Sequence, residues 1–340
     1  MKSVAIGIDI GGTNTAIGII DREGNVLNSR SIPTPSKQEN PSGSQSLSDD
    51  ILGRYILKLS STLAEMITAV KNTNDEIIVE GIGMGAPNGN YYNGTIEFAP
   101  NLPFVGIVHI VELLQAKHPD LKVIKLTNDA NAAAIGEMIY GGAKDMKNFV
   151  MYTLGTGVGS GIVVNGDLVY GHDGFAGECG HTMLIPGGRH CGCGIPGHLE
   201  AYTSASGMKR TAFELLSFYD GYSSELAEYS YKEMTSKTIY EAAINGDEIA
   251  LEVFKQTGEY LGQGMADTVH HLSPEAIFVF GGPTAAGEVI FDPIRKGIQK
   301  YLLPIYNKPN GVKIVPSQLK MGDAAIMGAS ALVWQEIQKD

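Results

Sequence analysis

Residues 4–21 read VAIGIDIGGTNTAIGIID, which is an apolar run, a Gly-Gly-Thr-Asn turn and a second apolar run. A polar turn, REGN (22–25), follows, and VLNSRSI (26–32) is a third extended segment. Short apolar runs separated by glycine and polar residues are typical of strands joined by tight turns. A parallel pair would need a crossover of a dozen or more residues between its strands, and these turns are far shorter. The sequence therefore predicts an antiparallel meander at the start of the chain.

A second copy of this pattern occupies residues 149–169. FVMYTLGTGVGSGIVVNGDLV aligns with AIGIDIGGTNTAIGIIDREGNVL so that Gly155 falls on Gly11. Short meanders are common, so the repeat alone suits two unrelated hairpins as well. The 340 residues exceed the ~100–200 of a typical domain, however, and a duplication would explain the length. The sequence favours a duplicated, two-lobed α/β architecture with a cleft between the lobes.

The other segments alternate between helical and extended patterns. Residues 33–50 are rich in Pro and Ser and indicate a surface loop, and 214–236 show no clear pattern and are interpreted as an insertion. Helices are predicted over about 50–71, over 237–272 with a break at Gly246, after residue 283, and over 323–338; strands are predicted over 77–87 and 277–282.

Composition excludes several classes of protein. Apolar residues make up 43% and charged residues 18%, which supports a large core. Asp and Glu outnumber Lys and Arg by 37 to 25, and the net charge of −12 disfavours a nucleic-acid surface. No stretch approaches the ~20 apolar residues of a membrane span, Asp9 interrupts the opening apolar run, and three cysteines cannot build a disulfide framework. We expect a soluble, acidic, cytoplasmic α/β protein that binds neither nucleic acid nor membrane.

The glycine turns are candidate phosphate-binding sites. Backbone N–H groups of a tight Gly11-Gly12-Thr13 turn can bind an anion, and Asp9 can bind Mg²⁺ through carboxylate oxygen. The second turn, Gly155-Thr156-Gly157, resembles a dinucleotide fingerprint, but a strand rather than a helix follows it, so that motif is rejected. Each turn alone is equally explained as a structural hairpin. The pair, with Gly281-Gly282 as a third glycine turn, favours a nucleotide site.

Two polar residues stand where a strand gives way to a helix in LTNDANAAAIGE (126–137). Asp129 could be the N-cap of that helix, which is the commonest duty of such a residue. It could instead be a general base, with Asn128 orienting the acceptor. The sequence leaves both roles open.

A cluster of histidines and cysteines follows the second turn. Nine residues separate His181 from Cys191, one separates Cys191 from Cys193, and four separate Cys193 from His198. Two thiolates and two imidazoles suit a tetrahedral structural zinc ion. His172 and His190 are rival ligands, and a glycine-rich loop with two unreactive thiols is the alternative. Cys179, between apolar neighbours, is interpreted as a buried residue.

Taken together, these segments resemble the ROK family of sugar kinases and sugar-responsive repressors. The resemblance covers nearly the whole chain, and the order NDAN, E-x-G-H and C-x-C-G-x-x-G-x-x-E is highly specific. The matching segments are GIDIGGTNTAIGIID (7–21), GIGMGAPNGNYYNGTIEFAPNLPF (81–104), LTNDANAAAIGE (126–137), TLGTGVGSGIVVNGDLVYGHDGFAGECGH (153–181), CGCGIPGHLE (191–200) and FGGP (280–283). The resemblance implies the two-lobed, actin-like (ribonuclease H-like) ATPase fold, which we divide into a smaller lobe of 1–127 plus 323–340 and a larger lobe of 128–322 that carries the zinc loop.

The resemblance also implies roles for individual residues. ATP phosphates are expected at Asp9, Gly11, Gly12 and Thr13 and at Gly155, Thr156 and Gly157, and adenosine at Gly281 and Gly282. Sugar hydroxyls are expected at Asn101, Asn128, Asp129, Glu178, His181 and Glu200, with Asp129 as the base. Zinc is expected at His181, Cys191, Cys193 and, where the family usually has cysteine, His198. A second departure is GAPNGN (85–90), which affects the expected sugar pocket near Asn88 and Gly89.

The activity that the resemblance implies is ATP- and Mg²⁺-dependent phosphorylation of a glucose-like hexose at O6, by a cytoplasmic homodimer. The alternatives are a kinase for an N-acetylhexosamine and a sugar-sensing transcriptional regulator. Regulators of the family carry a DNA-binding region ahead of the first turn, and only five residues precede Ile6 here, so the kinase is favoured. An actin-like scaffolding ATPase would have no use for the E-x-G-H and C-x-C-G elements.

Overall fold

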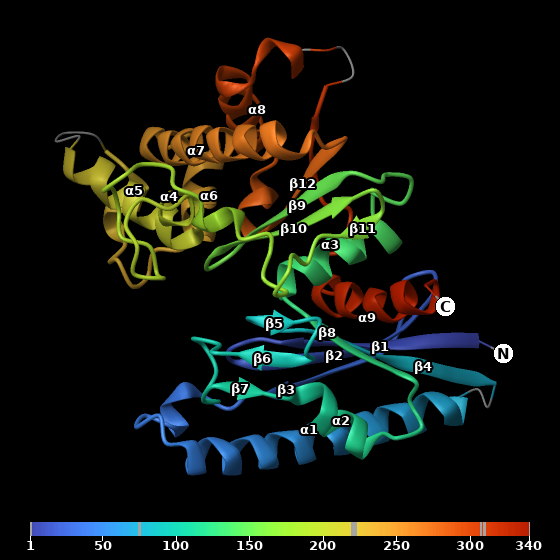
Figure 1. Ribbon diagram of the computed structural model, residues 1–340. Coiled ribbons are helices and arrows are strands. Elements are labelled where there is room, and N and C mark those ends of the chain that lie inside the picture. Colours follow the sequence, from blue (N-terminus) through green and yellow to red (C-terminus); the bar gives the residue numbers. More distant parts are fainter. Residues whose placement is uncertain (1, 74–75, 219–222, 307, 309–310, 340) are drawn as a thin grey trace. The chain divides into compact units, whose positions relative to one another are not determined.

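The computed structural model of the protein describes residues 2–73, 76–218, 223–306, 308 and 311–339. The chain forms two compact units (Figure 1). Unit 1 comprises residues 1–145, 168–176 and 318–340, and unit 2 comprises 146–167 and 177–317. This division differs from the predicted boundaries at 127/128 and 322/323. Helix α3 (Asp129–Ile139) belongs to unit 1 because it packs there against helix α9 (Ala324–Ile337).

Unit 1 is built on a five-stranded sheet in the order β3-β2-β1-β4-β8. Its first three strands form the predicted antiparallel meander, and β4 and β8 continue the sheet in parallel. The strands are β1 (Lys2–Ile10), β2 (Asn14–Asp21), β3 (Val26–Pro33), β4 (Ile77–Gly85) and β8 (Val123–Thr127).

One face of this sheet packs against helices α1 (Gln45–Thr73) and α2 (Ile110–Lys117). Side chains alternate between the two faces of a strand, and Ile6 and Ile8 of β1 are fully buried in this core with Leu59 of α1. The helix predicted over 50–71 is confirmed but begins earlier. The loop predicted over 33–50 is therefore shorter, and it contains a 3₁₀ turn, η1 (Lys37–Glu39), capped by Ser36.

The opposite face of the sheet lies against α9, and glycines make this close approach possible. A Cβ atom on Gly7 of β1 would overlap the carbonyl oxygen of Ile326, and one on Gly83 of β4 would overlap that of Ala329. Helix α3 crosses α9 in the same way, because a Cβ on Gly136 would lie 2.8 Å from Cα of Gly328. The prediction that the small-residue tail helix packs closely on another element is confirmed.

A small antiparallel sheet of short strands completes unit 1 together with residues 168–176. Its strands are β5 (Gly89–Asn90), β6 (Thr95–Glu97) and β7 (Ile107–Val108). Tyr170 stacks on Tyr91 with ring centroids 4.0 Å apart, and the Asn90 side chain donates to the Asp173 carbonyl at 2.8 Å. These contacts attach residues 168–176 to unit 1.

Unit 2 repeats the sheet topology of unit 1. Its order is β11-β10-β9-β12-β13, in which β9 and β10 are an antiparallel pair and β12 and β13 continue in parallel with β9. Strands β9, β10, β12 and β13 thus correspond to β1, β2, β4 and β8, and the predicted duplication is confirmed. The strands are β9 (Phe149–Leu154), β10 (Val158–Val164), β11 (Asp167–Leu168), β12 (Ala276–Gly281) and β13 (Lys313–Pro316).

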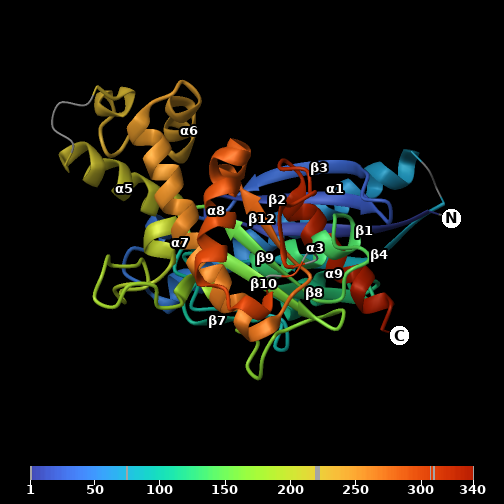
Figure 2. The same cartoon turned by 90° about the horizontal axis from the view of Figure 1, so that it is seen from above.

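Helices α7 and α8 of unit 2 run side by side in both views (Figures 1 and 2). The predicted break at Gly246 is confirmed: its φ of 90° ends one helix, and Asp247 caps the next by accepting from the Ala250 amide at 2.9 Å. The helices are α4 (Glu200–Thr203), α5 (Ala205–Phe218), α6 (Ser236–Ile244), α7 (Glu248–Leu272) and α8 (Glu288–Tyr301), with 3₁₀ turns η2 (Cys179–His181), η3 (Glu225–Glu228), η4 (Gly282–Ala286) and η5 (Pro304–Tyr306).

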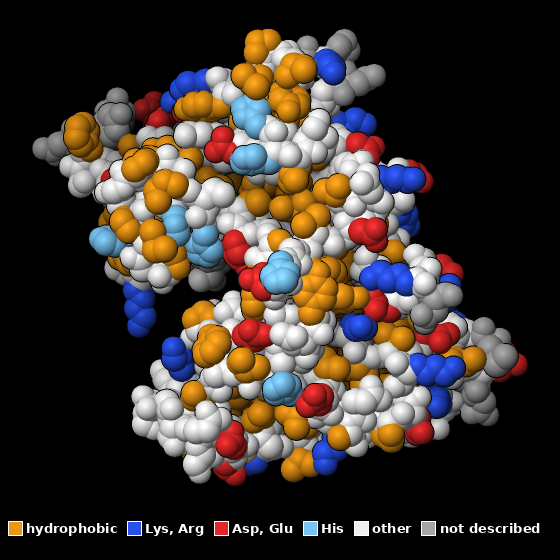
Figure 3. Space-filling model, viewed as in Figure 1, with side chains coloured by type: hydrophobic (Ala, Val, Ile, Leu, Met, Phe, Trp, Pro, Cys, Tyr) orange, Lys and Arg blue, Asp and Glu red, His pale blue; other side chains and the backbone are white. Residues whose placement is uncertain are grey.

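The segment 214–236, predicted to be a patternless insertion, begins inside α5 and contains η3. Its residues 219–222 lie outside the described residues. Among the helices that the structure describes, none is both long and apolar enough to cross a membrane. The face drawn in Figure 3 carries Lys and Arg side chains interspersed with Asp and Glu rather than gathered into one patch.

The glycine contacts of α9 lead to a stability prediction. Gly7→Ala places a methyl group onto backbone atoms that cannot rotate away, so it should destabilise the protein by about 3 kcal/mol. The matched control is Gly53→Ala in α1, where nothing lies within 4 Å of the new atom and the better helix former should stabilise by about 0.5–1 kcal/mol. Urea unfolding followed by circular dichroism measures both, and equal stability of the two variants would contradict the proposed packing.

Candidate functional site

The candidate residues of unit 1 gather at the carboxyl ends of its parallel strands. Asp9 lies near the end of β1, Gly85 ends β4, and Asp129 begins the helix that follows β8. A Cβ atom on Gly85 would lie 3.6 Å from Cα of Asp129 and 3.8 Å from Oδ1 of Asp9. The carboxylate of Asp9 and the backbone of Asp129 therefore both lie close to this glycine, at the edge where open α/β sheets bind ligands. Sequence reasoning did not single out Gly85. Its contribution is the absence of a side chain, which leaves space between Asp9 and Asp129.

Asn128, not Asp129, is the N-cap of α3. The Asn128 side chain accepts hydrogen bonds from the amides of Ala130 at 2.7 Å and Asn131 at 3.3 Å. The interpretation of Asp129 as the cap is therefore wrong. Asp129 is the first residue of the helix and accepts from the Ala130 amide at 2.8 Å. Because Asn128 satisfies the helix end, the second carboxylate oxygen of Asp129 is not needed for capping.

Both carboxylates of this edge hold their protons more tightly than ordinary aspartates. Burial, followed by the nearby negative charge of Asp129, raises the pKa of Asp9 to about 6. The Asp129 side chain is accessible to solvent, but protein atoms crowd it on the remaining sides, and this burial raises its pKa. A carboxyl group with a raised pKa is a stronger proton acceptor, and two neighbouring carboxylates attract a divalent cation.

The first glycine turn lies beside these carboxylates. It is exposed, with the Gly11 amide donating to the Asn14 carbonyl at 3.1 Å and the Thr34 amide donating to the Thr13 carbonyl at 2.9 Å. Asn101 packs against it, since a Cβ on Gly12 would lie 3.3 Å from Cβ of Asn101. The structure thus brings the turn and Asn101 together, although about 90 residues separate them in the sequence.

The GAPNGN segment packs beneath the end of β8. Asn88 has a φ of 52°, and its side chain donates to the Glu97 carbonyl at 3.0 Å. A Cβ atom on Gly89 would overlap the carbonyl oxygen of Thr127, directly before Asn128. The departure from the family pattern therefore lies next to the candidate sugar-binding residues.

In unit 2 the two glycine turns are neighbours at one edge of the sheet. The Gly155–Gly157 turn joins β9 to β10, and the Gly155 amide donates to the Gly157 carbonyl at 2.9 Å. Gly281 pairs with Leu154 in the parallel ladder of β12 and β9, so it ends beside that turn. Its φ of 120° and its approach to the Leu154 carbonyl oxygen both exclude a side chain.

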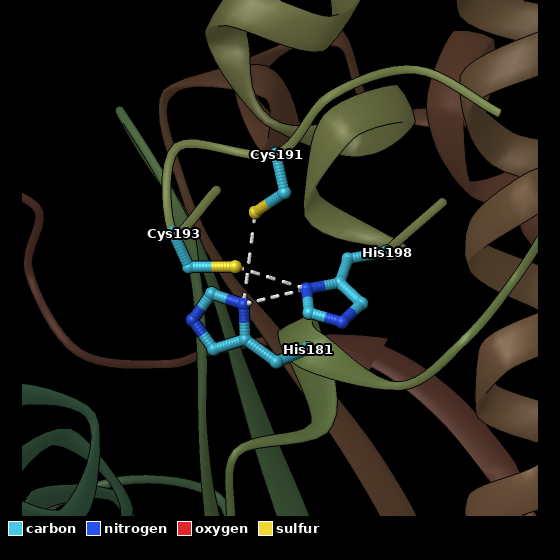
Figure 4. Close-up of side chains that lie close together, drawn as sticks. All are labelled: His181, Cys191, Cys193 and His198. Atoms are coloured by element: carbon cyan, nitrogen blue, oxygen red, sulfur yellow. Dashed lines mark hydrogen bonds between the residues drawn. The ribbon is translucent and has the colours of Figure 1, made fainter. Parts of the chain in front are cut away.

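The predicted metal ligands converge on one point (Figure 4). One ligand atom from each of His181, Cys191, Cys193 and His198 lies within 4.8 Å of all the others. The two Nδ1 atoms are 3.3 Å apart, and sulfur–nitrogen distances are 3.7 Å from Cys191 to His181 and 3.2 Å from Cys193 to His198. Two sulfur and two nitrogen donors in this arrangement fit a tetrahedral zinc site.

Two rivals for this cluster are not part of it. Within the described residues, neither His172, which belongs to unit 1, nor His190 joins a group of potential ligands. Cys179 is half-buried rather than fully buried, and its amide donates to the Ser160 hydroxyl at 3.1 Å. The loop is closed by the Cys191 amide, which donates to the Ile195 carbonyl at 3.2 Å.

Two glutamates adjoin the metal cluster. Glu178 lies 3.9 Å from Nε2 of His181. Glu200 accepts from the Cys191 thiol through Oε1 at 3.1 Å and from the Val158 amide through Oε2 at 3.0 Å. The second contact, which no sequence pattern indicated, connects the metal loop to the Gly155–Gly157 turn.

The structure therefore collects the predicted residues into one group per unit. Unit 1 holds Asp9, Gly11, Gly12, Thr13, Asn101, Asn128 and Asp129. Unit 2 holds Gly155, Thr156, Gly157, Glu178, His181, Cys191, Cys193, His198, Glu200, Gly281 and Gly282.

Known proteins similar to this chain are sugar kinases and related regulators. Glucokinases of Thermotoga maritima and Halalkalibacterium halodurans are 32% and 33% identical to it, over 99% and 97% of this chain and 99% and 95% of theirs. The regulator NagC of Escherichia coli is 27% identical, and the match covers 97% of this chain and 75% of NagC. A crystal structure of a ROK family glucokinase from Streptomyces griseus in complex with glucose and AMPPNP matches with a TM-score of 0.73 and 30% identity, over 98% of this chain and 99% of that one.

The similarity extends over the whole length and includes both sheets, so the chain has the two-lobed, actin-like ATPase fold of its solved relatives. The sequence model of the ROK family matches residues 5–336. The chain belongs to the ROK family.

Proposed function

We propose that this protein transfers the γ-phosphoryl group of ATP to the O6 hydroxyl of a glucose-like hexose. That it is a sugar kinase follows from its similarity to glucokinases over nearly its whole length. The observation that carries the finer proposal is the Asp129 carboxylate, which is solvent-accessible, has a raised pKa and is released from capping by Asn128. Asp129 would accept the hydroxyl proton as the sugar oxygen attacks phosphorus.

The nucleotide is assigned to the glycine turns. Backbone amides of Gly11–Thr13 and Gly155–Gly157 would bind phosphate oxygens, and Gly281–Gly282 would lie against adenosine. Asp9, whose carboxylate is held beside that of Asp129, would bind Mg²⁺ directly or through water. The cation, when bound, neutralises charge on the phosphates.

The sugar is assigned to polar side chains that together offer amide and imidazole donors and carboxylate acceptors: Asn101, Asn128, Asp129, Glu178, His181 and Glu200. His181 can serve the metal and the sugar together. Its Nδ1 atom faces the metal cluster, whereas its Nε2 atom points toward Glu178 at 3.9 Å. A metal-bound imidazole keeps its second nitrogen for such a contact.

Zinc is the metal we assign to His181, Cys191, Cys193 and His198. The donor set fits a zinc ion. At position 198 an imidazole nitrogen replaces the cysteine sulfur that the family usually has, and both are ordinary zinc ligands. Zinc, when bound, cross-links the loop. The chain's own residues then keep Glu178 and His181 at the 3₁₀ turn η2 and Glu200 at the start of α4.

The acceptor and the assembly are part of this proposal. Identities of 32–33% with glucokinases against 27% with NagC favour a kinase over a DNA-binding regulator. Among acceptors, glucose is proposed, and N-acetylhexosamines are the alternative. A homodimer in the cytoplasm is proposed from the family resemblance alone.

A coupled ATPase assay with glucose, mannose, N-acetylglucosamine and N-acetylmannosamine tests which sugar is the acceptor. If none of these sugars stimulates ATP hydrolysis, the proposed activity is refuted.

Removal of the base should separate turnover from binding. Asp129→Asn keeps the shape of the side chain but accepts no proton, so kcat should fall by about 10²–10⁴-fold. Hexose affinity, measured by titration calorimetry, should stay within a few-fold of that of the unsubstituted protein. Asp120→Asn, an exposed aspartate in the same unit, is the control and should retain full activity. Near-normal turnover of Asp129→Asn would show that another group is the base.

The raised pKa values predict an unusual pH profile. A base must be deprotonated, and both Asp9 and Asp129 ionise above the range of ordinary aspartates. Because Asp9 must be ionised to bind Mg²⁺, the ratio kcat/KM should fall as pH drops through about 6, and the raised pKa of Asp129 acts in the same direction. An ordinary aspartate would delay this loss to about pH 4. Initial rates between pH 5 and 9, with circular dichroism to verify folding, measure the profile, and a constant ratio down to pH 5 would contradict the prediction.

The metal assignment predicts a selective loss of zinc. Cys193→Ser removes one of four ligands and should leave the purified protein with little zinc, a lower melting temperature and faster proteolysis near residue 190. Cys179→Ser is the matched control, because this thiol is outside the cluster, and it should retain about one zinc per chain. Metal content is measured by mass spectrometry. Zinc-free unsubstituted protein, or equal zinc in both variants, would overturn the assignment.

A further inference from the structure

We propose that Glu200 is a positioning residue for the Gly155–Gly157 turn, whose backbone its carboxylate holds in place. The inference rests on the proposed function in so far as it takes this turn to bind the phosphates of ATP. It adds a nucleotide-directed role to a residue assigned above to the sugar alone. Two contacts between Glu200 and the turn, both inside unit 2, support it.

The first contact is a hydrogen bond from backbone to carboxylate. Val158 is the first residue of β10 after the turn, and its amide donates to Oε2 of Glu200 at 3.0 Å. A hydrogen bond to a charged acceptor is about twice as strong as one between neutral groups. The contact therefore determines the direction in which the chain leaves the turn.

The second contact is the close approach of the Glu200 carboxylate to Gly157. A Cβ atom at this position would lie 2.5 Å from Oε2 of Glu200, which is too close for carbon and oxygen. The carboxylate thus lies directly against the backbone of the turn. Gly155, by contrast, has open space where its side chain would be. Of these two glycines, Gly157 is therefore the one that packs against the carboxylate.

The other carboxylate oxygen of Glu200 contacts the metal cluster and takes no part in holding the turn. The Cys191 thiol donates to Oε1 at 3.1 Å. When a thiol binds zinc, its proton leaves to solvent and the sulfur forms a bond to the metal, so it no longer donates. Oε1 then becomes available to another donor, such as a sugar hydroxyl. The bond from Val158 to Oε2 needs no thiol and is expected in both the metal-free and the metal-loaded protein.

A role limited to sugar binding makes a different prediction from a role in the turn. A glutamate that contacts only the sugar affects nucleotide affinity little when no sugar is present. A glutamate that holds the turn affects it strongly under the same conditions. The test is therefore the affinity for Mg²⁺ and AMPPNP, a non-hydrolysable ATP analogue, measured by calorimetry on zinc-containing protein without any sugar.

Glu200→Ala should weaken AMPPNP binding by about tenfold or more, because it removes a charged acceptor from a backbone amide. Glu200→Gln retains an oxygen acceptor for Val158 and should bind AMPPNP within about threefold of the unsubstituted protein. Unchanged binding by Glu200→Ala, with only sugar affinity reduced, would overturn the inference. Absence of AMPPNP binding in the unsubstituted protein would instead refute the proposed function, and the inference with it.

A double-mutant cycle gives an independent check. Gly157→Ala should weaken AMPPNP binding when Glu200 is present, since the new methyl group displaces either the carboxylate or the turn. In the Glu200→Ala background the methyl group has space, and the same substitution should cost little more. Additive effects would overturn the inference. If Glu200→Ala loses zinc, Gly157→Ala in the otherwise unsubstituted protein decides, and unchanged AMPPNP binding by this variant would refute the coupling.

Discussion

The close approach of α9 to the sheet of unit 1 determines where Asp129 lies. Backbone of α9 touches β1 and β4 at Gly7 and Gly83, so the helix axis is set by the sheet rather than by side chains. Helix α3 then crosses α9 at Gly136, against Gly328. Two successive backbone contacts leave little freedom for the N-terminus of α3. Since close-packed interiors transmit small displacements, a methyl group at Gly7 would be felt at a carboxylate several elements away.

The two units use one sheet topology in different ways. In each, an antiparallel pair closes a glycine turn, and parallel strands continue the sheet from the first strand of the pair. Carboxyl ends of parallel strands are where such sheets place ligands. Unit 1 places acids there, Asp9 and Asp129. Unit 2 places glycines there, and its turn is contacted by Glu200 at the start of α4, beside the candidate metal cluster. The same topology thus carries two glycine turns with different neighbours, and these neighbours give the two turns different chemistry.

Features that depend on neighbouring residues could be predicted from the sequence. The meander, the duplication, the helix break at Gly246 and the convergence of the four metal ligands each follow from a local pattern, and the structure confirms them. A pattern of apolar and glycine residues specifies elements because it repeats with the period of a strand or helix. In the histidine and cysteine loop, the ligand spacing itself is short enough to restrict the geometry.

Features that depend on distant backbone positions could not be predicted. The cap of α3 was ambiguous because Asn128 and Asp129 are both good caps, and only the helix start, fixed by packing on α9, decides between them. The same packing moves α3 into unit 1, against the predicted boundary. The contact of Glu200 with Val158 joins residues 42 positions apart. Spacing in the metal motif indicates that Glu200 is near the loop, but not which amide its second oxygen meets.

The acidic edge of unit 1 is unfavourable for folding at neutral pH, because burial disfavours the charged form of Asp9. The folded-state pKa of Asp9, about 6, lies above the ordinary value of 3.8, so the folded protein binds the proton more tightly than the unfolded chain. This group therefore contributes stability below about pH 4, and the contribution is lost as pH rises toward 6. Burial therefore disfavours the charge of Asp9 at neutral pH, and the neighbouring charge of Asp129 adds to this cost. A divalent cation would relieve the cost, because it compensates the carboxylates together. The backbone contacts of α9 with the sheet and with α3 hold these two residues close together although burial disfavours their charged forms.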